Sequence, residues 1–155
     1  MVGPEALDTV HGLLHATYHP DHPLARHIGL RGPSDLRDVD RMVERRLAKL
    51  LTLVAYDPSG RPVGAAVNDS CHVEEEDAME EEMEGIEEGR FRPILAIHHQ
   101  LRRQNRHVFQ EMGADKLLDL SVVAVEEAAR GQGVATDLIR WLQRVIRRTD
   151  DHKFS

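Results

Sequence analysis

The stretch Val123-Ala-Val-Glu-Glu-Ala-Ala-Arg130-Gly131-Gln132-Gly133-Val134-Ala135-Thr136 decides how this chain is interpreted. It follows an apolar run of strand length and leads directly into an amphipathic helical pattern. A glycine-bearing turn at a helix start leaves several backbone N–H groups without partners, and the positive end of the helix dipole adds to them. Such groups favour a phosphate ligand. The stretch therefore predicts a pyrophosphate-binding turn.

Three glycine-rich phosphate motifs can be compared with this turn. A P-loop needs G-x-x-x-x-G-K-[ST], and no Lys lies near Gly133. The dinucleotide fingerprint G-x-G-x-x-G begins at Gly131 but meets Thr136 where its third glycine belongs. The pattern that fits is R-x-x-G-x-[GA], which starts at Arg130 and ends at Ala135. The alternative is an ordinary strand-to-helix turn whose glycines serve the backbone geometry alone.

The acidic character of the chain is concentrated in one segment. The 155 residues carry a formal net charge of −7, and ten acidic side chains with no basic one fall between residues 74 and 88. Without those ten, 17 acidic residues face 20 basic ones, so the remainder is close to +3. We therefore expect residues 69–90 to form an acidic surface loop or short helix.

Composition also restricts the classes of partner. A single cysteine, Cys71, excludes a disulfide framework within the chain and suits a reducing compartment, so a cytoplasmic location is expected. No run approaches the roughly 18 apolar residues of a membrane span, and the first residues lack the pattern of a signal peptide. Aromatic residues make up only 4%, which argues against stacking on nucleic acid. The oligomeric state stays open.

The periodicity of apolar residues changes several times along the chain. Helical spacing occurs within residues 7–18, 36–50, 94–108 and 138–146, and strand-like runs occur at residues 51–56, 62–67 and 117–125. The first two strands flank Asp57-Pro-Ser-Gly60, which predicts a hairpin, and the third is expected to be buried on both faces. In the second helix, Leu36, Val39, Val43, Leu47 and Leu50 are expected on the buried stripe, and the apolar stripe of the third helix is expected to consist of Ile94, Ile97, Leu101 and Val108. The order predicts one domain over residues 1–155 with an α/β fold, an α+β arrangement with a mixed sheet.

Several segments together resemble one family. Besides the turn at Arg130, these are His19-Pro-Asp-His-Pro-Leu24, Pro62-Val-Gly-Ala-Ala-Val-Asn68, Phe91-Arg-Pro-Ile-Leu95 and Leu120-Ser-Val-Val123. In this order they resemble the arthropod-type arylalkylamine N-acetyltransferases of the GNAT superfamily, the dopamine N-acetyltransferase-like group. The similarity extends over roughly residues 5–150.

The resemblance implies a GNAT acyl-CoA N-acyltransferase fold that is incomplete at its C-terminus, because a further strand, helix and hairpin would follow Ser155. It implies transfer of an acetyl group from acetyl-CoA to the primary amine of an arylalkylamine of the dopamine, serotonin or tryptamine type, by direct attack in a ternary complex, without a metal. The residues expected to bind the coenzyme lie on the third strand and in the turn: Val123, Ala124, Val125, Arg130, Gly131, Gln132, Gly133, Val134, Ala135 and Thr136.

The candidate general base departs from the family pattern. His22 stands where the family carries its catalytic Glu, and an imidazole that titrates near pH 6.5 is chemically able to replace it; Asp21 is the nearby alternative. Two competing interpretations are a catalytically inactive, acyl-CoA-binding relative and a truncated fragment without function. The spacing of His11, His15 and His19 suits a zinc site, but a solvent-facing row of histidines is the preferred interpretation.

Overall fold

The computed structural model describes residues 1–30, 33–72, 91–105, 107–113 and 116–151. The N-terminal half contains the 3-10 helix η1 (Pro4–Ala6), helix α1 (Leu7–Leu13), the π-helix η2 (Leu14–Tyr18) that continues it, α2 (Pro23–His27), α3 (Pro33–Ala48), and strands β1 (Leu53–Tyr56) and β2 (Pro62–His72). The C-terminal half contains α5 (Arg92–Gln104), α6 (His107–Met112), β3 (Lys116–Val125), the 3-10 helix η3 (Glu127–Ala129) and α7 (Val134–Asp151).

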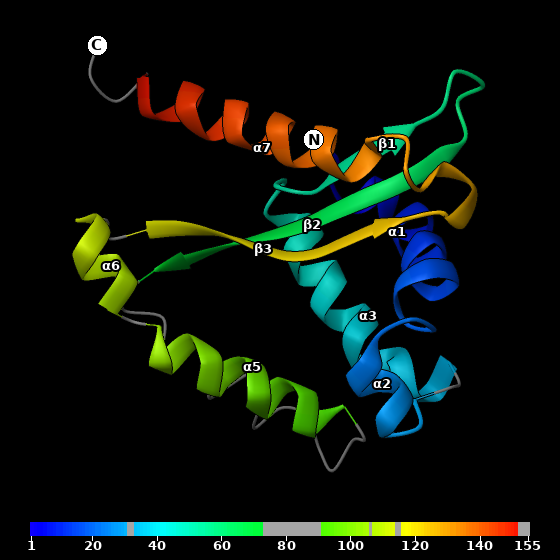
Figure 1. The fold of residues 1–155 in the computed structure, drawn as a ribbon, viewed down its shortest axis with the longest axis horizontal. Helices are drawn as coiled ribbons and strands as arrows, with labels where there is room; N and C mark the ends of the chain where they lie inside the picture. The colour runs from blue at the N-terminus through cyan, green and yellow to red at the C-terminus, as the bar shows by residue number, and fades with distance from the viewer. Residues whose placement is uncertain (31–32, 73–90, 106, 114–115, 152–155) are drawn as a thin grey trace.

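A three-stranded sheet of order β1-β2-β3 lies between two layers of helix (Figure 1). Both described pairings are antiparallel. Because side chains alternate between the faces of a strand, neighbouring residues of β2 belong to different cores. Ala66 packs with Leu138 and Leu142 of α7, whereas Val67 packs with Val10, Leu14, Val43 and Leu47 of α1, η2 and α3. The predicted α/β architecture is confirmed, but among the described strands the sheet is antiparallel and not mixed as expected.

The hairpin predicted between β1 and β2 is confirmed, and its turn is held by one carboxylate. Asp57 Oδ1 accepts hydrogen bonds from the backbone N–H groups of Ser59 and Arg61, both at 2.9 Å. These bonds lower the pKa of Asp57 to about 2; the largest contribution is the bond from the Ser59 hydroxyl. Gly60 has a φ of 84°, which explains the glycine at the end of the turn.

The boundary predicted for the acidic segment is wrong at its start. Asp69 to His72 belong to β2, which stays paired with β3 as far as the partners His72 and Lys116. The polar residues are tolerated in the strand because the Asp69 carboxylate is neutralised by Lys49 Nζ at 2.5 Å. Residues 73–90, which hold the ten acidic side chains found between residues 74 and 88, lie outside the described residues.

Three predictions of burial are also wrong. Helix α3 ends at Ala48, so Leu50 leaves the buried stripe, adopts a φ of 56° and is 55% exposed. The third predicted helix is two helices, and Ile97 and Leu101 on α5 are 42% and 50% exposed. Strand β3 pairs on one side only among the described strands, and Leu120 is 38% exposed. A periodic pattern shows neither where a helix ends, which decides the exposure of Leu50, nor which elements pack against α5 and β3, which decides the exposure of the other residues.

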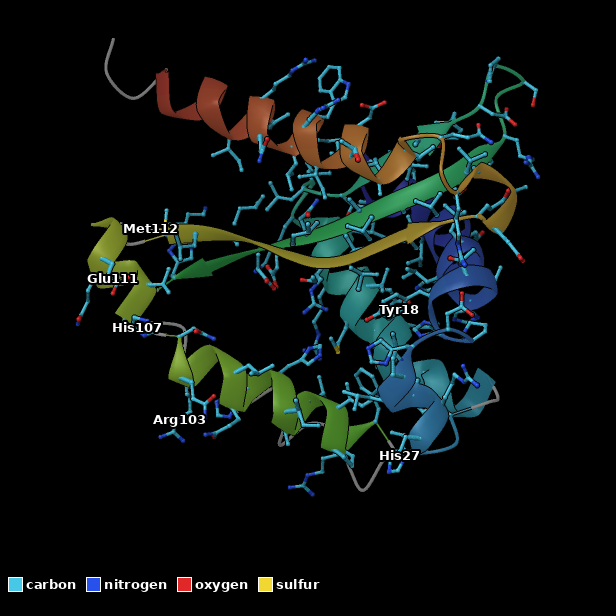
Figure 2. All side chains as sticks on the ribbon, in the orientation of Figure 1. Tyr18, His27, Arg103, His107, Glu111 and Met112 are labelled. Atoms are coloured by element: carbon cyan, nitrogen blue, oxygen red, sulfur yellow. The ribbon has the colours of Figure 1, made fainter. Side chains whose placement is uncertain are left out.

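The polar side of α5 and α6 faces away from the sheet. Arg103, His107 and Glu111 point outward there (Figure 2). No helix in the described part of the chain is both long and apolar enough to cross a membrane.

Candidate active site

The turn between β3 and α7 has the geometry of an anion cradle. Gly131 and Gly133 have φ values of 76° and 87°, a region that strains residues with a side chain. The first bond into α7 runs from the N–H of Asp137 to the carbonyl of Gly133, at 2.9 Å. In the described structure, the backbone N–H groups of residues 131–136 donate to no protein acceptor. Donors and helix dipole are thus both available for an anionic group.

Arg130 fixes this turn to the rest of the molecule. Its Nε donates to the carbonyl of Val125 at 3.1 Å, and its Nη2 lies 2.8 Å from Asp21 Oδ2. The guanidinium therefore links the end of β3 to the segment that follows η2. This geometry favours a structural role for Arg130 within the turn.

Strand β3 offers backbone groups at its outer edge. Glu126 N donates to Val63 O, so Gly64 and Val125 form a non-hydrogen-bonded pair, and Ala66 and Val123 form the next one. The N–H and C=O groups of Val123 and Val125 consequently point away from β2. The bond from Arg130 to the Val125 carbonyl agrees with this direction.

Two further features shape this edge. The register shifts by one residue where Val67 pairs with Val122 but Asn68 pairs with Leu120, so Ser121 is the extra residue of a β-bulge. At Gly64, an added Cβ would lie 3.0 Å from Val134 Cγ1 and 3.1 Å from the carbonyl of Ala124. The glycine therefore allows β2 to pass close beneath the start of α7, which keeps the turn next to the strand edge.

His22 and Asp21 lie beside the turn. The candidate bases and the predicted coenzyme residues are therefore close enough to form one site. His22 is the N-cap of α2: its Nδ1 accepts from the N–H of Ala25 at 3.2 Å, and Pro23 fills the first helical position. Because the Nδ1 lone pair is used in this bond, a neutral ring carries its hydrogen on Nε2. Burial lowers the pKa of His22, which favours the neutral form.

One cleft brings residues from both predicted segments together. It has a volume of about 360 Å³ and is lined by Thr17, Tyr18, Asp21, His22, Pro23, Val123, Ala124, Val125, Arg130 and Ala135. Five of the ten coenzyme residues expected from the sequence are in this set: Val123, Ala124, Val125, Arg130 and Ala135. Gly131, Gln132, Gly133, Val134 and Thr136 lie in or just after the adjoining turn, where they contribute the N–H groups described above.

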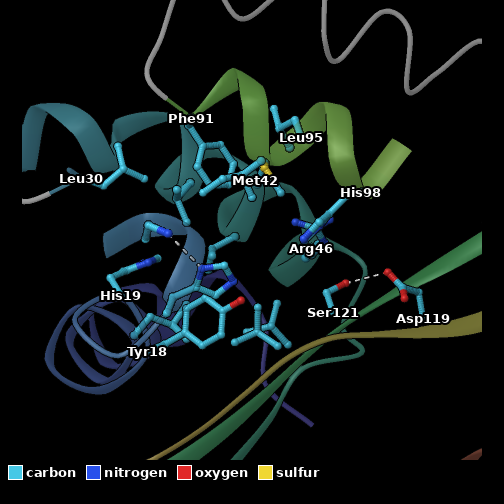
Figure 3. Close-up of a pocket in the computed structure, with 18 of the residues that line it drawn as sticks. Tyr18, His19, Leu30, Met42, Arg46, Phe91, Leu95, His98, Asp119 and Ser121 are labelled. Carbon is cyan, nitrogen blue, oxygen red and sulfur yellow. Dashed lines mark hydrogen bonds between the residues drawn. The ribbon is translucent and has the colours of Figure 1, made fainter. Parts of the chain in front are cut away.

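A second cavity, of about 290 Å³, adjoins the cleft, and Tyr18 and His22 line both. Their rings are tilted to each other with centroids 5.0 Å apart, and burial raises the pKa of Tyr18. The walls of the cavity come from η2, α3, α5 and β3 and are mainly apolar (Figure 3). Its polar members also include Arg46, His98, Asp119 and Ser121, of which Ser121 Oγ donates to Asp119 Oδ2 at 2.9 Å.

Sequence reasoning missed Arg46, His98 and Asp119 as residues of this cavity. Two of them carried a signal, because a charge within an apolar pattern is unusual. Arg46 follows Val43 by three residues and directly precedes Leu47 on the buried stripe of α3, and Asp119 interrupts the apolar run of β3.

The row formed by His11, His15 and His19 does not face solvent. The preferred interpretation of a solvent-facing row is therefore wrong. His19 is only 7% exposed, and burial, followed by the neighbouring His15, lowers its pKa to about 4. His15 Nε2 lies 2.8 Å from Asp40 Oδ1, and His11 Nε2 lies 3.8 Å from the same oxygen. The row is covered because α3 packs against it and supplies Asp40. Within the described residues, no group of three or more potential ligands is arranged to hold a metal ion.

The fold defined by this sheet, turn and cleft is the N-acetyltransferase fold. Arylalkylamine N-acetyltransferase 2 from Aedes aegypti matches with a TM-score of 0.83 and 20% identity, over 96% of this chain and 69% of that chain. Drosophila melanogaster polyamine N-acetyltransferase, which forms N-acetylagmatine, matches with a TM-score of 0.83 and 20% identity, over 97% and 70%.

A mosquito arylalkylamine N-acetyltransferase-like 5b protein matches with a TM-score of 0.81 and 22% identity, over 96% of this chain and 69% of that chain. No family model and no curated protein matches the sequence. The resemblance noted in the sequence is therefore confirmed at the level of the fold, and this chain spans about 70% of the length of the solved structures.

Proposed function

We propose that this chain belongs to an acetyl-CoA-dependent N-acetyltransferase that acts on a primary amine of the arylalkylamine type, such as dopamine, serotonin or tryptamine, in the cytoplasm. The observation that carries the proposal is the set of N–H groups of residues 131–136 at the start of α7, which donate to no protein acceptor in the described structure. They lie next to the outward backbone groups of Val123 and Val125 and suit the pyrophosphate and the pantetheine arm of coenzyme A, respectively.

The cleft and the adjoining cavity suit a direct transfer of the acetyl group between two bound substrates. The cleft beside the turn suits the acyl-CoA, and the cavity suits the amine, so the two substrates meet at Tyr18 and His22, which line both. A mainly apolar cavity favours an amine with an apolar ring or chain. Outward N–H groups on β3 also suit stabilisation of the negative charge that develops on the thioester oxygen.

A base must take a proton, because an alkylamine with a pKa near 10 is almost fully protonated at pH 7. His22 is our candidate, and Asp21 is the alternative. For His22 to accept a proton at Nε2, the ring must move its hydrogen to Nδ1 and give up the bond from Ala25 N–H. Asp21 Oδ2 accepts from Arg130, and the Asp21 side chain is 62% exposed.

A second candidate function follows from the same bond. Because Nδ1 of His22 is used to cap α2, the chain also fits an acyl-CoA-binding relative that does not turn over. Binding and turnover therefore need separate measurements.

Two assays test these proposals. Calorimetric titration with coenzyme A measures binding at the turn, and release of free thiol from acetyl-CoA in the presence of dopamine measures transfer. Binding together with amine-dependent thiol release supports the enzyme, and binding alone supports the inactive relative. A folded protein with no measurable affinity for coenzyme A contradicts both.

A further inference from the structure

Arg46 is an unusual member of the cavity wall. It lies on α3, its side chain is 13% exposed, and it lines a cavity whose other walls are mainly apolar. Removing a charge from water costs free energy unless hydrogen bonds or an ion pair compensate for it. The partners of this guanidinium therefore decide what the cavity can bind.

The compensation within the protein is incomplete. Arg46 Nε is buried and makes no hydrogen bond in the described part of the chain; Asp69 Oδ2 lies 3.6 Å away, beyond hydrogen-bond distance. The Asp69 carboxylate is shared, since its other oxygen contacts Lys49 Nζ at 2.5 Å. A guanidinium has five N–H donors, and Asp69 is the only ionic partner found for Arg46 among the described residues. An acceptor supplied by a ligand would complete the set.

The position of Arg46 shows which part of a ligand it would meet. In Figure 3, Arg46 and His98 lie on one side of the cavity and Tyr18 and His19 lie on the other. Phe91, Leu95 and Met42 form apolar wall between the two sides. An acceptor molecule whose amine is at Tyr18 and His22 therefore extends its far end towards Arg46.

We propose that Arg46 is a specificity-determining residue that contacts the far end of the amine substrate. It favours a distal oxygen acceptor, such as the hydroxyl of a phenol ring, and it disfavours a second ammonium group by like-charge repulsion. This inference rests on the proposed acetyltransferase function. Asp119 lies on the same side and is the feature that would favour a second cation, but its Oδ2 already accepts from Ser121.

The test compares three amines: tyramine, phenethylamine (the same molecule without the hydroxyl) and 1,5-diaminopentane. Wild type should have a kcat/KM for tyramine about 10- to 100-fold above that for phenethylamine, as expected for a hydrogen bond to a charged group, and the lowest value for the diamine. Arg46→Met should bring the tyramine to phenethylamine ratio close to one and raise the value for the diamine. An unchanged ratio, or a wild-type preference for the diamine, overturns the inference.

Lys49→Met is the matched control, because Lys49 contacts the same Asp69 but does not line the cavity; it should leave the three relative rates unchanged. If Arg46→Met does not fold, Arg46→Lys keeps the charge without the planar fork and should weaken only the preference for the hydroxyl.

Absence of turnover with all three amines contradicts the proposed function instead. In that case, calorimetric titration of tyramine and phenethylamine into the CoA-loaded protein tests Arg46: equal affinities overturn its role, and tighter tyramine binding that Arg46→Met abolishes supports it.

Discussion

The coenzyme side of the candidate site and the cavity beside it differ in how the chain builds them. The coenzyme side needs one continuous stretch, from Val123 on β3 to Thr136 on α7, and it presents mainly backbone groups. The cavity takes side chains from η2, α3, α5 and β3, which are far apart in the sequence. A backbone site depends on local geometry, whereas a side-chain site depends on how distant elements pack. Substitutions on the coenzyme side and substitutions in the cavity should therefore impair different properties of the protein.

His22 lies where the two sides meet, and its substitution should have the largest effect. His22→Asn removes the imidazole but keeps a good N-cap for α2, so the stability should be nearly unchanged while kcat/KM falls by about 100-fold or more, as for loss of a general base. Because burial lowers the pKa of His22, wild-type activity should be constant above about pH 6.5 and decline at lower pH. Steady-state kinetics between pH 5 and 9 measure both effects.

An unchanged pH profile in His22→Asn would leave His22 as a helix cap only. Asp21→Asn then tests the alternative base with the same assay. His22→Ala, which removes the cap as well, separates the two roles, since it should lower the free energy of unfolding by about 1 kcal/mol.

The cavity side should be the more sensitive to acid, because His19 lies in its wall. The pKa of His19 is about 4 in the folded chain and near 6.5 when unfolded. The unfolded chain therefore binds the proton more tightly, and stability falls as the pH drops from 6.5 towards 4, by up to about 3 kcal/mol. The groups that act on this ring are His15, Asp40, His22 and His11.

Urea denaturation at a series of pH values measures this loss. His19→Phe should flatten the dependence between pH 6.5 and 4, whereas His27→Gln, which removes an exposed histidine on α2, should not. An equally steep decline in His19→Phe would show that other groups cause the acid sensitivity.

On the coenzyme side, a change of backbone preference should weaken binding. Gly133→Ala places a side chain at a φ of 87°, which costs about 1–2 kcal/mol, and the strain is relieved if the N–H groups of the turn rotate away. Affinity for coenzyme A should then decrease about tenfold. Gly60→Ala is the matched control because Gly60 has a φ of 84° in the distant hairpin turn: it should lower stability to a similar extent without changing the affinity. Calorimetry and thermal unfolding of both variants make the comparison.

The difference between the two sides also explains what the sequence could predict. The turn from Arg130 to Thr136 was predictable because the glycines, the strand before them and the helix after them are contiguous. The hairpin at Asp57 was predictable for the same reason. Arg46 was missed because its importance depends on Asp69 and on the cavity, which exist only after α3 packs against the sheet. Leu50 was misplaced because periodicity cannot show where a helix ends.

The smallest effect is expected at the link between the two sides, the contact of Arg130 with Asp21. The two side chains are 48% and 62% exposed, and exposed ion pairs contribute only about 0.2–1 kcal/mol. Arg130→Gln should therefore change stability little, but it also removes the bond to the Val125 carbonyl, so the affinity for coenzyme A should fall by a few-fold at most. Asp21→Asn removes the charge of the partner and keeps that bond, and it should leave the affinity unchanged. A much larger loss in Arg130→Gln alone would show that the guanidinium contacts the coenzyme directly, and the coenzyme side would then depend on a side chain as the cavity does.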